Sequence, residues 1–298
     1  MLSKKAIFLF NKLDHFFEGN RDENLFLTFF RVGVSLVAMI EIASLGVDLH
    51  LFFSLSETLI PQELMYLESG YFKYFDPFYQ FLENYGLTGY FYYVSISAYF
   101  LSLFFLLIGL FTRYSAVISL ILQVIIFRSF VPFNYGYDYF LTMSLFYCVV
   151  FPVGKYSSAD SEIFNLKNNL YFNYRRVLQL HLAIAYFFSG IAKALDSGWW
   201  NGRSVWNALA SIDNLFYSFS PFILAITGIA TVFLELTYSF WVMNSATRKY
   251  VIIAIVLMHA SIAITMGLYA FSSIMIVWNI AAYGNLLEKN ESIYVETS

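Results

Sequence analysis

Two residues that could do chemistry, Lys193 and Asp196, stand near the end of a long apolar stretch, 174–202. A lysine at the centre of a bilayer costs about 2.5 to 3.5 kcal/mol on insertion scales, so it usually has a use or a neutralising partner. Desolvation beside aromatic side chains favours the neutral amine, which can act as a general base. The structural alternative pairs Lys193 with Asp196 as boundary residues that reach towards water. The sequence leaves both interpretations open.

Four further polar residues fall in or beside apolar stretches and are candidates for a site. Arg128 and Asp138 flank a short bend, where they would either pair with each other or contribute to binding and catalysis. Glu235 and His259 lie deep within apolar windows, and the structural interpretation is a hydrogen-bonded pair that joins two helices. The functional alternative for this pair is a proton relay or a site for a substrate headgroup.

Aromatic residues complete the candidate substrate-binding set, with Tyr137 beside Asp138 and the pair Trp199–Trp200 just after Lys193. Tryptophans at this position are more simply interface anchors. The small residues around Gly190 let another helix, or a flat ligand, approach the backbone closely. No histidine and carboxylate spacing on one helix face predicts a metal site, and no Gly-rich phosphate loop, GxSxG elbow or HExxH helix is present.

The composition is that of a membrane protein. Of the 298 residues, 59% are hydrophobic and only 12% are charged, whereas soluble domains carry about 25% charged residues. The net charge of −3 gives no reason to expect nucleic acid as a partner. The single cysteine, Cys148, excludes an internal disulfide and a CxxC redox pair.

Apolar windows of about 17 to 25 residues are long enough to span a bilayer, and they predict an all-α, polytopic helical bundle with about eight transmembrane helices. The windows are 25–47, 88–111, 114–130, 138–153, 175–196, 221–243 and the long stretch 250–284, which would hold two spans with Gly267 at the bend. We expect an amphipathic N-terminal segment at 1–20, one transmembrane domain at 21–287 and a short tail at 288–298. Residues 48–87 are expected to form a re-entrant or interfacial loop.

The distribution of basic residues predicts the orientation. Most lysines and arginines fall in segments on the same side as the N-terminus, whereas the outer segments keep only Lys73 and Arg203. By the positive-inside rule, both termini are cytoplasmic in a multi-pass protein of the cell membrane. Lys193, Asp196 and Asp138 then lie near the outer leaflet.

The segment YFFSGIAKALDSGWWNG, at 186–202, resembles the membrane part of vitamin K-dependent gamma-carboxylases, which belong to the HTTM (horizontally transferred transmembrane) group. The matching pattern is an aromatic-rich helix, a small-Gly-x-x-Lys step, and then Asp, Trp and Gly. Supporting matches are Arg31, the GLFTR turn at 109–113 and the NYGYDYF stretch at 134–140. The resemblance covers about residues 20–285. The carboxylases keep a histidine in the NYGYDYF segment and carry a large soluble domain, and this sequence shows neither.

The resemblance implies an extracytoplasmic site in which Lys193 is the base that deprotonates a reduced quinone or vitamin K-like molecule. The missing histidine and soluble domain argue against carboxylation of a protein substrate. A second branch of the group, the sporulation-delaying-protein B-like proteins, implies instead a maturation or partner subunit for a small secreted peptide toxin, working with a soluble partner protein. A transporter built on Glu235 and His259 is a third hypothesis, although no repeated half is visible.

Overall fold

The computed structural model describes residues 23–48, 51–52, 76–127, 133–164, 172–210 and 219–295. Within these ranges the chain is helical and contains no β-strand, as the apolar windows predict. The chain forms two compact units. We call Leu27–Asn168 the N-terminal unit, and Asn169–Ser298 together with Met1–Phe26 the C-terminal unit. Each is described by itself.

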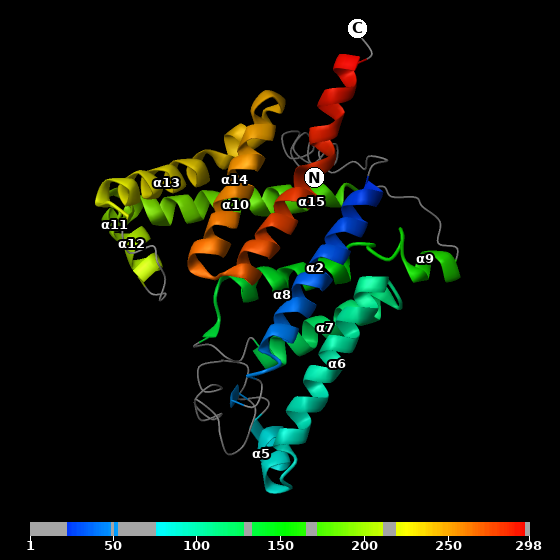
Figure 1. Cartoon of the computed structure of the whole chain (residues 1–298). Helices are drawn as coiled ribbons and strands as arrows, with labels where there is room; N and C mark the ends of the chain where they lie inside the picture. The colour runs from blue at the N-terminus through cyan, green and yellow to red at the C-terminus, as the bar shows by residue number, and fades with distance from the viewer. Residues whose placement is uncertain are drawn as a thin grey trace, which may run out of the picture. The chain divides into compact units, whose positions relative to one another are not determined.

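The N-terminal unit is helical and contains two long apolar helices, α2 and α6, together with shorter ones (Figure 1). Its elements are α2 (Glu23–Leu45, which begins in the other unit), α5 (Asp76–Asn84), α6 (Thr88–Ile108), α7 (Thr112–Leu122), its π-helical continuation η2 (Gln123–Phe127), α8 (Gly136–Val150) and α9 (Ala159–Ile163).

Arg31 lies in the core of this unit with 1% of its surface exposed. Its guanidinium donates to the backbone carbonyls of Leu106 and Leu107, in the last turn of α6, and to the carbonyl of Ser157. The last carbonyls of a helix have no partner within the helix, so a buried helix end needs donors of this kind. Arg31 therefore fixes the end of α6 against α2.

Asp160 holds the turn between α6 and α7. Its carboxylate accepts from the backbone N–H groups of Phe111 and Thr112, both at 2.7 Å, and from the Thr112 hydroxyl. Carboxylates are favoured at helix N-termini, where N–H groups lack intrahelical partners. Gly109 ends α6 with φ +74°, and an added Cβ would lie 2.9 Å from Arg31 Nη1, so the turn requires glycine.

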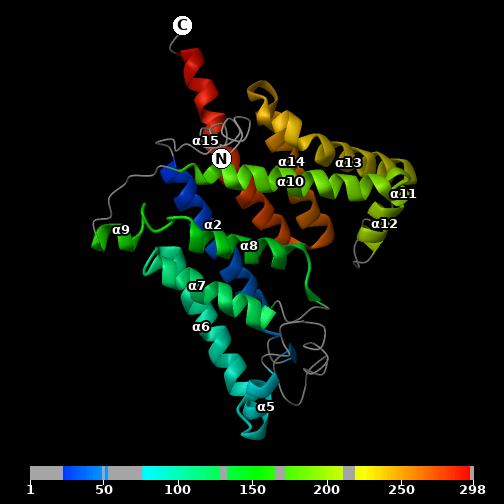
Figure 2. The same cartoon turned by 180° about the vertical axis from the view of Figure 1, so that it is seen from behind.

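The C-terminal unit contains the stretch that carries Lys193. Its elements are α10 (Tyr174–Leu195), α11 (Ser197–Trp200), α12 (Arg203–Ala210), α13 (Pro221–Met243), α14 (Ser245–Met266) and α15 (Tyr269–Val295). Helices α10 and α13 lie side by side in both views, with α11 and α12 at the end where α10 stops (Figures 1 and 2).

Short polar side chains set the helix boundaries of this unit. Asn173, Asp196, Ser220 and Asn244 each precede a helix and accept a hydrogen bond from a backbone N–H in its first turn. Gly267 ends α14 in the left-handed region, at φ +68°, so the predicted bend of the 250–284 stretch is confirmed.

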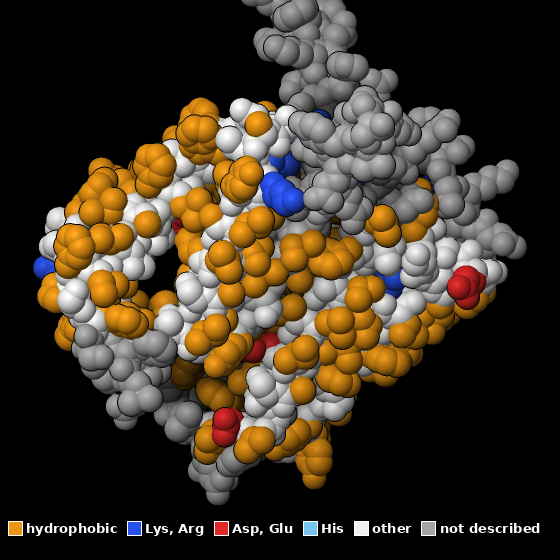
Figure 3. Space-filling model, turned by 45° about the horizontal axis from the view of Figure 1, so that its top comes forward, with side chains coloured by type: hydrophobic (Ala, Val, Ile, Leu, Met, Phe, Trp, Pro, Cys, Tyr) orange, Lys and Arg blue, Asp and Glu red, His pale blue; other side chains and the backbone are white. Residues whose placement is uncertain are grey.

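Among the described residues, five helices are long and apolar enough to cross a membrane, which indicates a multi-pass membrane protein. They are α2, α6, α10, α13 and α14. Apolar side chains spread over the face in Figure 3, and large ones such as Phe222 and Phe240 are more than 70% exposed. Exposed apolar surface on this scale fits contact with lipid. Each of the other predicted spans also contains a helix, but the count of eight spans and the orientation stay predictions.

Three parts of the sequence prediction fall outside the described residues. These are the amphipathic segment at 1–20, Arg128, and residues 53–75 of the predicted interfacial loop.

Candidate functional site

Gly190 brings α10 and α13 close enough for their side chains to pair. A Cβ added at Gly190 would lie 2.7 Å from the backbone nitrogen of Leu236 and 3.1 Å from the carbonyl carbon of Glu235. Any larger residue would push the two backbones apart. Small residues at the interfaces of membrane helices commonly allow such a close approach. Of the two expected uses of the small residues around Gly190, helix packing is the one that the structure forms.

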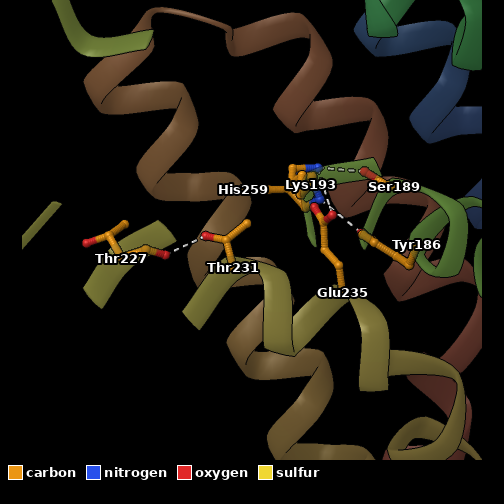
Figure 4. Close-up of polar contacts among 7 residues, drawn as sticks. All are labelled: Tyr186, Ser189, Lys193, Thr227, Thr231, Glu235 and His259. Carbon is orange, nitrogen blue, oxygen red and sulfur yellow. Dashed lines mark hydrogen bonds and ion pairs between the residues drawn. The ribbon is translucent and has the colours of Figure 1, made fainter. Parts of the chain in front are cut away.

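Lys193 and Glu235 form an ion pair at this crossing. Lys193 Nζ lies 2.7 Å from Glu235 Oε2 and donates to Ser189 Oγ at 2.6 Å. The Glu235 side chain is 7% exposed and that of Lys193 is 21% exposed. The two residues are 42 positions apart in the chain, and Figure 4 shows them converging with Ser189 from α10 and α13. A charged pair with so little water is costly to form and to break.

Trp199 covers the ammonium of Lys193. Its ring centroid lies 5.2 Å from Nζ, within the range of a cation–π contact. Trp199 is held there because α11 packs against α13: its backbone carbonyl lies so close to Gly228 that no side chain would fit at that position. The lysine thus meets a carboxylate, a hydroxyl and an aromatic face.

Asp196 caps the N-terminus of the next helix, α11. Its carboxylate accepts from the Gly198 N–H at 2.9 Å and from the Ser204 hydroxyl at 2.8 Å. These two hydrogen bonds hold the pKa of the Asp196 carboxyl below its ordinary value of 3.8. Among the described residues, the ion-pair partner of Lys193 is therefore Glu235, and the alternative pairing with Asp196 is not formed.

His259 belongs to a buried hydrogen-bond chain beside the ion pair, and its expected bond to Glu235 is not among the described contacts. Its Nε2 lies 2.9 Å from the Tyr186 hydroxyl. Asn279 Nδ2 donates to that hydroxyl and to the Met275 carbonyl, and Asn279 Oδ1 accepts from Tyr238. The chain thus runs Tyr238, Asn279, Tyr186, His259.

The direction of this chain sets the tautomer of His259. The Met275 carbonyl can only accept, so the amide nitrogen of Asn279 faces both it and the Tyr186 oxygen. We therefore assign the Tyr186 proton to the bond with His259 Nε2, and this assignment places the proton of a neutral His259 on Nδ1. Within the described part of the chain, His259 Nδ1 is buried and has no hydrogen-bond partner. A buried donor without a partner is unfavourable, so this N–H is a candidate for a ligand oxygen.

The other polar residues near the ion pair do not join it. Thr227 and Thr231 lie apart from the cluster on α13, and their hydroxyls bond to carbonyls one turn earlier in the same helix (Figure 4). On the face seen in Figure 3, a hollow opens on the side of α11, α12 and α13, with acidic atoms beside it. We call Lys193, Glu235, Ser189, Tyr186 and His259 the polar cluster.

The predicted site residues are only partly brought together. Lys193, Trp199, Glu235 and His259 lie in the C-terminal unit, and Trp200 is half-exposed there, with its Nε1 donating to the Ala194 carbonyl. Tyr137 and Asp138 lie in the N-terminal unit, where both are buried and line a cavity. Arg128 is not among the described residues.

Sequence reasoning missed Ser189, Tyr186, Tyr238 and Asn279. Asn279 stands alone among apolar residues in IVWNIAA, and such a residue needs a buried partner, so it could have been found. The tyrosines carry no comparable signal, because the chain contains 24 of them and nothing in the sequence distinguishes Tyr186 and Tyr238 from the others. Ser189 lies one helical turn before Lys193, a spacing at which side chains meet.

No family model matches the chain, and no curated protein or solved structure matches it either.

The described residues contain no group of three or more His, Cys, Asp or Glu side chains placed to hold a metal ion. The polar cluster thus brings together the ion pair of Lys193 and Glu235, the Ser189 hydroxyl and the buried Nδ1 of His259.

Proposed function

We propose that this chain is a cell-membrane protein of the HTTM group, similar to the membrane part of vitamin K-dependent gamma-carboxylases, whose polar cluster transfers protons near the extracytoplasmic leaflet. Lys193 is the base, and a quinone-type molecule with an ionisable hydroxyl is the substrate or cofactor. The observation that carries this proposal is the ion pair of Lys193 with Glu235 at 2.7 Å, within a helix crossing that excludes most water.

Glu235 gives Lys193 a way to become a base. In a pair shielded from water, a proton can pass from Nζ to Oε2, and this leaves a neutral amine beside a neutral acid. The neutral amine then accepts a proton from the substrate, which becomes an anion. The ammonium so formed stays beside that anion, while Ser189 Oγ keeps Nζ in place.

The residues around the pair fit a flat molecule that bears oxygen atoms. The unpartnered N–H of His259 would donate to one oxygen, and the indole of Trp199 offers an aromatic face beside Nζ. When bound, a reduced quinone supplies a hydroxyl whose deprotonation makes it reactive towards oxidation. Tyr186 and Asn279 keep His259 in the tautomer that this bond needs.

The test is binding and ionisation of a soluble menadiol analogue. We would add it under anaerobic conditions to the purified protein in detergent and follow the absorbance of the hydroquinone anion across pH. Wild-type protein should produce the bound anion at a pH at which the free compound is neutral. Lys193→Met should bind the analogue without forming the anion, and His259→Phe should weaken binding.

Arg203→Ala is the matched control, because it removes an exposed cation at the start of α12 and leaves the ion pair in place. It should behave as wild type. An anion that persists in a folded Lys193→Met protein would overturn the role of Lys193. Absence of saturable binding to wild type would overturn the quinone-type substrate.

A further inference from the structure

The N-terminal unit contains a cavity that the proposed function does not use. It has a volume of about 210 Å³ and is lined by residues of α2, α6, η2, α8 and the segment before α8. A dry cavity of about 150 Å³ is enough to hold a benzene molecule, so this one has room for a ring and a small head group. All of its lining residues fall within the N-terminal unit.

Aromatic rings form much of the wall. Phe52, Phe127, Phe133, Tyr135 and Tyr137 all line the cavity. Phe52 and Phe133 meet edge to face with their ring centroids 5.4 Å apart. Faces of aromatic rings attract cations, and several such rings around one space recognise organic ammonium groups.

Two carboxylates face the same space. Asp138 is 8% exposed, and its Oδ2 is held by the backbone N–H of Tyr135 at 3.0 Å. Glu41 is half-buried, and no hydrogen bond or ion pair to its carboxylate occurs among the described residues. Glu41 thus offers a carboxylate at the cavity wall, and a cation bound to it would also lie near Asp138.

Gln123 adds a polar group at the wall that is independent of the acids. It is 1% exposed and lines the cavity, and its Oε1 accepts from the Tyr99 hydroxyl at 2.6 Å. With Oε1 engaged by Tyr99, the amide Nε2 provides the donors of this side chain. Gln123 begins the π-helical turn that ends at Phe127, and both end residues line the cavity. Such turns occur often at functional sites.

The donor set argues for an organic cation and against a metal ion. Calcium needs six to eight oxygen ligands, and the described residues hold no group of three or more metal-binding side chains. Most of the wall is hydrocarbon, which a hydrated ion would not favour.

We infer that this cavity is a second ligand site, which binds a small amphipathic amine. The protonated amine pairs with Glu41 and Asp138, the apolar body packs among the aromatic rings, and an oxygen on that body accepts from Gln123 Nε2. The site is separate from the Lys193 cluster and does not depend on its proposed function.

Three soluble probes separate these contacts. Tyramine carries the amine, the ring and an oxygen; 2-(4-hydroxyphenyl)ethanol replaces the amine with a neutral hydroxyl; and phenethylamine lacks the phenol oxygen. Isothermal titration calorimetry with the full chain in detergent should show saturable binding of tyramine. The neutral alcohol should bind about tenfold more weakly or worse, because the charged contact is lost.

Variants assign the contacts to residues. Glu41→Gln should weaken tyramine about tenfold while leaving the neutral alcohol unchanged, and Glu41→Asp should retain tyramine because it keeps the charge. Gln123→Met should reduce the affinity for tyramine to that for phenethylamine. Glu162→Gln, which removes an exposed carboxylate of α9 in the same unit, is the control and should bind as wild type.

Equal affinity for tyramine and the neutral alcohol would overturn the inference. So would tyramine binding that survives Glu41→Gln in a protein with the wild-type elution volume and melting temperature, because the amine would then sit elsewhere. Failure of all three probes to bind wild type would overturn it as well.

Discussion

Arg31 and Lys193 are both basic residues within apolar helices, the first buried and the second part-buried, but their surroundings differ. Arg31 donates to three backbone carbonyls in the N-terminal unit. Lys193 meets one carboxylate and one hydroxyl in the C-terminal unit. Carbonyls cannot take up a proton, so the Arg31 contacts can only hold structure. A carboxylate can take up a proton, which is why we propose proton transfer at Lys193 and not at Arg31. The partner of a buried cation therefore says more about its role than burial does.

The largest expected effect comes from Arg31→Leu. Three carbonyls would lose their donor in a buried place, so we expect a loss of about 3 kcal/mol or more in the free energy of unfolding, at about 1 to 3 kcal/mol for each unsatisfied group. Titration with SDS in mixed micelles, followed by circular dichroism, measures this loss.

Arg113→Leu is the matched control for Arg31→Leu. Arg113 is an exposed arginine in the first turn of α7 in the same unit, and its loss should change stability by less than about 0.5 kcal/mol. Equal effects of the two substitutions would mean that the carbonyl contacts of Arg31 contribute little to stability.

The second effect separates stability from chemistry at the ion pair. Lys193→Met or Glu235→Gln alone leaves one charge without its partner, and each should cost about 2 kcal/mol, below the value for a fully dry pair because Lys193 keeps some contact with water. The double variant should recover most of that stability and yet form no menadiol anion. A double-mutant cycle on the free energy of unfolding gives the coupling.

A purely structural pair would give a different pattern. The double variant would then regain both stability and the ionisation of the menadiol analogue. That outcome would make Lys193 a counterpart of Arg31.

The third effect tests the helix crossing that creates the pair. Gly190→Ala should lower the free energy of unfolding by about 1 to 3 kcal/mol. The new Cβ would meet the backbone of α13, so α10 and α13 would have to move apart. It should also weaken menadiol ionisation, since Nζ and Oε2 would separate. Gly284→Ala is the control: its Cβ would meet only Ile280 at 3.5 Å, an ordinary contact, so stability should be unchanged or higher.

Much of the fold could be predicted from the sequence, because a long run of apolar residues is enough to identify a membrane helix. The bend at Gly267 was predictable because glycine within a long apolar stretch commonly ends a helix. The division into two units was not, because it depends on which helices pack together. Arg31 shows the limit most clearly: its partners are backbone carbonyls, and every residue carries one.

The candidate site was predicted by residue but not by pairing. Lys193 and Glu235 were both candidates, but the only partner that the sequence suggested for the lysine, as one of two open interpretations, was Asp196, three positions later. Asp196 instead begins the turn Asp-Ser-Gly, and its carboxylate caps α11. An acid directly before a short helix is a local cap signal, and this signal could have removed Asp196 from the pairing.

The smallest expected effect is a pH dependence at this cap. Because the folded pKa of Asp196 lies below its ordinary value of 3.8, the cap stabilises the α11–α12 turn above that pH, and the contribution is lost as pH falls below it. Hydrogen exchange of residues 197–204 should therefore accelerate below about pH 4 beyond the intrinsic trend, and Asp196→Asn should remove this dependence. Lys193 pairs with Glu235 and not with Asp196, so menadiol ionisation should survive Asp196→Asn. Loss of ionisation in that variant, with the turn still protected, would return Asp196 to the proton path.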